Sequence, residues 1–174
     1  MGWKTFKEHF GIEHTVQITD AGLCIGSAYV HNIVTIDLKT GEIRQSNALS
    51  GFLNREYPQV LNSTAEERLQ LINAKDHFEK SITIYTYQGG EIIEKLCEDP
   101  KWPHLTHDGR QIYENTHSIN KDEVVVMAKR EFDAAQKMTL NRINEIKQQL
   151  QEVEGDYERY KIIGEKLERD YPGV

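Results

Sequence analysis

Long hydrophobic runs and targeting signals are missing from this chain of 174 residues. No stretch approaches the ~18 consecutive apolar residues that a membrane-spanning helix requires. The first residues, MGWKTFKEH, contain no apolar segment of the kind found in a secretory signal. These absences predict a cytoplasmic protein with no membrane partner.

The chain has fewer basic than acidic residues, 21 Lys and Arg against 28 Asp and Glu, and its formal net charge is −7. Division of the chain at residue 120 leaves both parts acidic. A protein that binds nucleic acid by neutralising phosphates needs a basic face, so we expect no direct nucleic-acid partner. Hydrophobic residues make up 38% of the chain, which indicates a modest core or an exposed helix.

The motifs of common enzymes and nucleotide-binding proteins are also missing. The patterns HExxH, GxSxG, GxGxxG and Walker A do not occur. Cys24 lies in an apolar run typical of a buried strand, and Cys97 lies beside acidic residues that raise a thiol pKa and lower its reactivity. We therefore expect structural cysteines, no cofactor and no enzymatic activity.

Strand patterns dominate the first half of the chain and predict an α+β protein with an N-terminal antiparallel sheet. Apolar residues alternate with polar ones over 14–19, return after a turn over 23–26, and continue over 32–38 and 42–46. This pattern predicts a meander of three or four strands over 14–46. The segment SITIYTY (81–87) predicts a further strand. Residues 91–96 pair back as a strand or form a short helix, and we favour the strand.

Two short helices, and one further segment that is a packed loop or a short helix, are predicted around these strands. Apolar spacings of three and four over 3–10 predict an amphipathic helix that Gly11 ends. Residues 47–62 predict a packed loop or short helix. Ser63 and Glu66 form a capping box, and the helix that follows is predicted to reach about Phe78.

The segment 100–120 is rich in turn residues and longer than most connections, and such loops often carry function. Aromatic and histidine side chains of this loop and of the SITIYTY strand are candidates for binding a partner protein; they are Trp102, His107, Tyr113, Tyr85 and Tyr87.

Histidines in the same loop give a weak alternative, a metal site formed by His104, His107 and His117. Zinc accepts such ligands, but the spacing matches no common zinc pattern. We favour surface or hydrogen-bonded loop histidines.

One long helix is predicted from residue 120 onward, because good helix formers dominate and no proline follows until Pro172. We therefore divide the chain into a sheet domain at 1–118 and a helical domain at 119–174. Gly155 leaves two alternatives, a continuous helix and a helical hairpin, and we favour the continuous helix.

From residue 143 the apolar positions recur in alternating steps of three and four, the narrow stripe of a coiled coil. The stripe predicts a homodimer or higher homo-oligomer, since a lone helix does not bury it. This oligomer seam comprises Ile143, Ile146, Leu150, Val153, Tyr157, Tyr160 and Leu167.

In general build the chain resembles the small accessory proteins with which bacteriophages bind and inhibit host machinery or defence systems. The resemblance is carried by the acidic composition, the turn-rich segments KTGEI and THDGRQIYENTH, and the terminal helix. It implies a non-enzymatic inhibitor or accessory factor that binds a partner protein in the host cytoplasm.

Two other functions remain open. One is a small-molecule or nucleotide-binding protein with a pocket between the sheet and the 100–120 loop, lined by Tyr85, Tyr87, His104 and His117. The other is a structural oligomer component in which the helix provides the main function.

Overall fold

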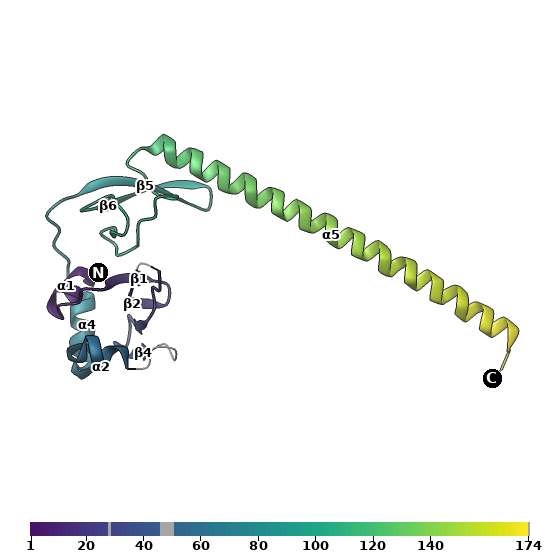
Figure 1. Ribbon diagram of the computed structural model, residues 1–174, viewed down its shortest axis with the longest axis horizontal. Helices are drawn as coiled ribbons and strands as arrows, with labels where there is room; N and C mark the ends of the chain where they lie inside the picture. The colour runs from purple at the N-terminus through teal and green to yellow at the C-terminus, as the bar shows by residue number, and fades with distance from the viewer. Residues whose placement is uncertain (28, 46–50, 174) are drawn as a thin grey trace. The chain divides into compact units, whose positions relative to one another are not determined.

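The computed structural model describes residues 1–27, 29–45 and 51–173. Contacts divide the chain into two compact units, residues 1–128 and residues 129–174. The fold class is α+β, as the sequence predicts, with short helices and antiparallel strands preceding one long helix (Figure 1).

Four strands form the first sheet in the order β1-β2-β3-β4, and each pairs antiparallel with the next strand along the chain. Their bounds are Thr15–Thr19 (β1), Gly22–Gly26 (β2), Val34–Ile36 (β3) and Ile43–Gln45 (β4). Every residue of β2 is buried, which explains its unbroken apolar sequence. The predicted meander is confirmed with four strands; residues 28 and 46 of the predicted range lie outside the described residues.

Helix α1 (Trp3–His9) packs against helix α4 (Ala65–Asn73). The backbone N–H of Gly2 donates to the carbonyl oxygen of Ile72 at 2.7 Å. A Cβ atom at Gly2 would lie 2.0 Å from the carbonyl oxygen of Leu71, so only glycine allows this close approach. As predicted, α1 ends before Gly11, which adopts φ 60°.

Two short helices, α2 (Phe52–Glu56) and α3 (Pro58–Asn62), occupy most of the segment predicted as a packed loop or short helix. Residues 47–50 of that prediction lie outside the described residues. Phe52, Leu53, Tyr57 and Val60 are buried, so both helices anchor on the core.

The predicted bounds of helix α4 are wrong at both ends. The capping residue is Thr64, whose hydroxyl oxygen accepts the backbone N–H of Glu67 at 3.1 Å, and not Ser63 paired with Glu66. The helix stops at Asn73 because Ala74 adopts an extended backbone conformation, so Phe78 lies outside it.

One hydrophobic core joins the first sheet to helices α1 to α4. Side chains from both sides of this interface are almost completely removed from water, and they dominate the stability of the unit. The largest of them are Phe6, Leu23, Ile25, Ile36, Leu53 and Ile72.

A second sheet consists of the hairpin β5 (Ile82–Gln88) and β6 (Glu91–Cys97), so the strand favoured for residues 91–96 is confirmed. Gly89 and Gly90 connect the strands with φ 59° and 89°, the left-handed conformation that tight hairpin turns require. Ile84, Cys97 and Ile112 form a small core beneath this hairpin.

The predicted irregular loop after β6 lies against both sheets. Tyr85 and Ser118 exchange backbone hydrogen bonds at 2.8 and 3.1 Å along the free edge of β5. The N–H of Ile18 in β1 donates to the carbonyl oxygen of Gly109 at 2.7 Å. The loop therefore ties the hairpin to the four-stranded sheet.

Helix α5 runs without interruption over Lys121–Asp170, 50 residues in all (Figure 1). Its first turn is capped by the side-chain oxygen of Asn120, which accepts the N–H of Asp122 at 3.0 Å. The helix continues through Gly155, so the continuous alternative is confirmed and the hairpin is wrong. At its start, Val124 and Ala128 are buried.

Candidate functional site

One candidate site is the apolar seam on α5, which lies in the unit 129–174. A single helix cannot cover its own side chains, and each member of the seam is 43% to 65% exposed. The helical backbone places these side chains along one stripe, because steps of three and four return to the same face.

The apolar spacing of the sequence continues after Leu167 to Tyr171, which is 65% exposed and follows the last residue of α5. Gly164 occupies the step between Tyr160 and Leu167, and a Cβ atom there would meet no atom within 4 Å. Nothing in the described contacts of one chain therefore requires glycine at this position.

The five predicted partner-binding residues are distributed over the 1–128 unit and have different surroundings. The ring of Trp102 contacts that of Tyr29 edge-on at 5.6 Å. Tyr113 is exposed, and its hydroxyl lies 3.2 Å from Nε2 of His31. The ammonium group of Lys121 lies over the ring of Tyr85, 5.9 Å from the ring centre.

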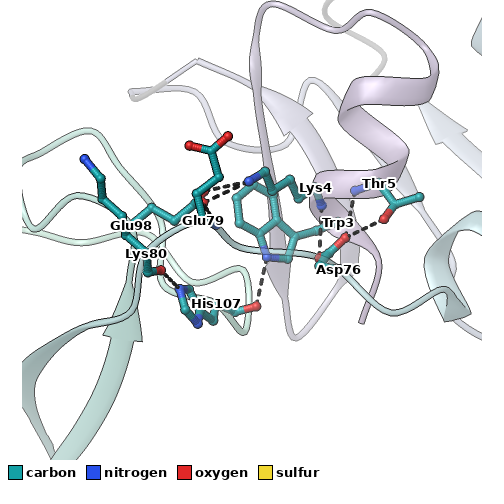
Figure 2. Close-up of polar contacts among 8 residues, drawn as sticks. All are labelled: Trp3, Lys4, Thr5, Asp76, Glu79, Lys80, Glu98 and His107. Carbon is teal, nitrogen blue, oxygen red and sulfur yellow. Dashed lines mark hydrogen bonds and ion pairs between the residues drawn. The ribbon is translucent and has the colours of Figure 1, made fainter.

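His107 belongs to an intramolecular stack, the Trp3 cluster, which consists of Trp3, Phe78 and His107. The rings of Phe78 and His107 are parallel within 3° with centres 3.8 Å apart. The indole N–H of Trp3 donates to the carbonyl oxygen of His107 at 3.0 Å, and Nε2 of His107 lies 3.0 Å from the carbonyl oxygen of Lys80 (Figure 2). His107 thus holds the loop against α1.

Two carboxylates complete these contacts (Figure 2). Asp76 accepts the backbone N–H groups of Lys4 and Thr5 at 3.1 and 2.7 Å, which satisfies donors in the first turn of α1. Glu98 accepts the Lys4 ammonium at 2.8 Å and the N–H of Glu79 at 2.7 Å. These contacts connect helix α1 to the segments that contain Asp76, Glu98 and His107.

The contacts of Glu98 make the stability of the 1–128 unit depend on pH. Burial opposes its ionisation, but the hydrogen bonds from Lys4 and Glu79 and the charge of Lys4 bring its pKa below the ordinary value. A carboxylate with a depressed folded-state pKa contributes stability above its unfolded pKa, about 4.3, and loses it as the pH falls through the folded value.

We expect Glu98→Gln to lower the free energy of unfolding at pH 7 and to have little effect at a pH below the folded-state pKa of Glu98. Chemical unfolding between pH 7 and pH 2.5 measures the difference between variant and wild type. Glu56→Gln, at an exposed position of α2, is the control and should change little at any pH. A constant difference for Glu98→Gln over the whole range would contradict this role of its charge.

A polar pocket of about 370 Å³ brings together two of the residues predicted to line a ligand site, Tyr87 and His117. Burial lowers the pKa of His117. The amide nitrogen and oxygen of Gln111, which also lines this pocket, are buried without a hydrogen-bond partner. The small-molecule function stays a prediction.

The other two predicted lining residues lie elsewhere. His104 lines a different pocket, of about 280 Å³, beside Trp3 and Phe78. Tyr85 pairs with Ser118 at the edge of β5. The four residues predicted to line one ligand pocket therefore do not all share one pocket in the structure.

The three loop histidines each have a separate partner. His104 lies 3.4 Å from Asp99, His107 bonds the carbonyl of Lys80, and Nδ1 of His117 lies 2.8 Å from the hydroxyl of Thr116. Over residues 1–27, 29–45 and 51–173, no three His, Cys, Asp or Glu side chains form a group that could hold a metal ion.

Both cysteines are buried and unpaired. Burial raises the pKa of the Cys97 thiol, and the charge of Asp99 adds to this effect. The direction agrees with the sequence-based expectation, but burial is the larger cause.

Comparisons add no relative: no family model matches the chain, and neither the curated proteins nor the solved structures contain a match. Among the described helices, none has the length and apolar character needed to cross a membrane.

Proposed function

We propose that the protein is a non-enzymatic protein-binding module whose α5 seam joins it to a second copy of the same chain. One observation carries the proposal: a 50-residue helix exposes an apolar stripe from Ile143 to Leu167 with coiled-coil spacing. Stripes of this kind stabilise a helix only when a partner covers them.

A second copy is the partner that the stripe favours. It offers the same spacing and the same length, so each apolar side chain of one helix has an equivalent site on the other. Charged and polar residues occupy most of the remaining surface of α5, although Phe132, Met138, Leu140, Ile162 and Ile163 are also exposed outside the seam. The expected role as an inhibitor or accessory factor, with a further protein partner, stays a prediction.

Sedimentation equilibrium of the full chain tests the proposal. We expect the mass at micromolar concentration to be about twice the chain mass of 20.2 kDa, with dissociation on dilution. A single 20.2 kDa species at every concentration would overturn it.

A further inference from the structure

We propose that the two α5 helices pair antiparallel, with the two-fold axis passing between residues 157 and 158. This inference rests on the proposed self-association and specifies the partner's orientation. It is carried by the charges along one side of the seam, which all pair with opposite charges in an antiparallel dimer, whereas a parallel dimer forms one attractive and one repulsive pair.

The seam assigns heptad positions along α5. Ile143, Leu150, Tyr157 and Gly164 take position a, and Ile146, Val153, Tyr160 and Leu167 take position d. Positions e and g flank this line, and their charges set the partner and its orientation.

On the e side the charge alternates in sign. The four successive e residues are Lys147, Glu154, Lys161 and Glu168. In an antiparallel pair, the e side of one helix faces the e side of the other in reversed order. Lys147 then faces Glu168 of the second copy, and Glu154 faces Lys161.

Both pairs are centred on the same point between residues 157 and 158, so one axis satisfies them together. Symmetry repeats each pair, and the four e residues of each copy all meet the opposite charge. In the single chain, the described contact of Lys161 is a distant one, 3.7 Å from Glu158. The pairing between copies is therefore compatible with the contacts within each helix.

A parallel pair brings g residues against e residues of the next heptad. Arg142 then faces Lys147, which repels, and Asp156 faces Lys161, which attracts. The parallel arrangement also stacks Gly164 on Gly164 in one layer and leaves a gap. An antiparallel pair places a d side chain in that layer, and a larger residue fills the space.

Distances between spin labels at two positions test the orientation in the full-length protein. Glu158→Cys lies near the proposed axis, and Asn141→Cys lies far from it. At a rise of about 1.5 Å per residue, the two labels at position 141 are separated by about 50 Å along the helices, and those at position 158 by only a few ångströms. The native cysteines are 0% exposed, and unmodified protein serves as the labelling control.

We expect a short distance at position 158 and a long one at position 141. Short distances at both positions would show a parallel pair and overturn this inference while leaving the proposed self-association intact. A long distance at 158 would displace the axis and also overturn it. Failure of both labels to couple, with a monomeric mass, would overturn the proposed function as well.

Charge reversal gives an independent test. Glu168→Lys places like charges opposite Lys147 and should weaken the dimer about tenfold at low salt. In an antiparallel dimer, adding Lys147→Glu to the same chain restores the pair. Lys147→Glu alone distinguishes the two orientations, because it weakens an antiparallel dimer, in which it faces Glu168, and strengthens a parallel dimer, in which it faces Arg142. Strengthening by Lys147→Glu alone would overturn the antiparallel orientation. An unrestored double variant would count against the orientation.

Discussion

Leu150→Glu is expected to leave the protein monomeric at concentrations at which the wild type is dimeric. Leu150 lies in the middle of the first half of the seam, and a partner helix would cover it from both sides. A carboxylate at this place loses its hydration without gaining a cation, and by symmetry the cost occurs twice in each dimer. We expect the dissociation constant to rise by at least about 100-fold, which corresponds to about 2.7 kcal/mol.

Gln148→Glu is the matched control, because it adds the same charge two residues away on the opposite side of the helix. It should leave the dissociation constant within about threefold of the wild type. Sedimentation equilibrium measures both variants. Equal masses for Leu150→Glu and the wild type at every concentration would remove the seam from the interface.

Arg68→Met is expected to destabilise the 1–128 unit by about 3–5 kcal/mol. The guanidinium group is buried, with the residue 7% exposed. It donates to the carbonyl oxygens of Gly41, Val60 and Ser63 at 2.7, 3.2 and 2.6 Å. Methionine fills a similar volume but leaves these acceptors without a donor.

These three acceptors lie on the β3–β4 turn, on α3 and just before α4, so one side chain crosslinks three segments. Arg68→Lys should recover only part of the lost stability. An ammonium group still donates hydrogen bonds, but it lacks the planar fork with which the guanidinium reaches several acceptors at once. Arg55→Met, on the exposed face of α2, is the control and should have a small effect. Urea unfolding gives the comparison, and equal losses for Arg68→Met and Arg55→Met would contradict the crosslinking role.

Patterns that depend on neighbouring residues could be predicted from the sequence. The meander followed from alternating apolar residues and turns, and α5 followed from 50 residues of helix formers without proline. The error in the α4 cap has a local cause. The sequence Ser63-Thr64-Ala65-Glu66-Glu67 offers two capping frames one residue apart. The hydroxyl of Ser63 is engaged instead with the carbonyl oxygen of Val60 and the guanidinium of Arg68, and Thr64 caps the helix.

Contacts between distant segments could not be predicted. Phe78 continues the apolar spacing of α4, but it leaves the helix and stacks on His107. Lys4 and Glu98 are separated by 94 positions, and no spacing rule pairs them. The role of Asp76 could not be predicted for the same reason, because the backbone N–H groups that it accepts belong to Lys4 and Thr5 of α1. The seam itself could be predicted, because a stripe depends only on the period of one helix.

The burial of Trp3 has a spectroscopic consequence. Both tryptophans, Trp3 and Trp102, precede residue 129, whereas the later unit contains the tyrosines of the seam and no tryptophan. Indole emission therefore follows the opening of the first unit alone, and circular dichroism at 222 nm is dominated by the long helix. Comparing the two signals during heating would show whether both units melt together or separately, without any label.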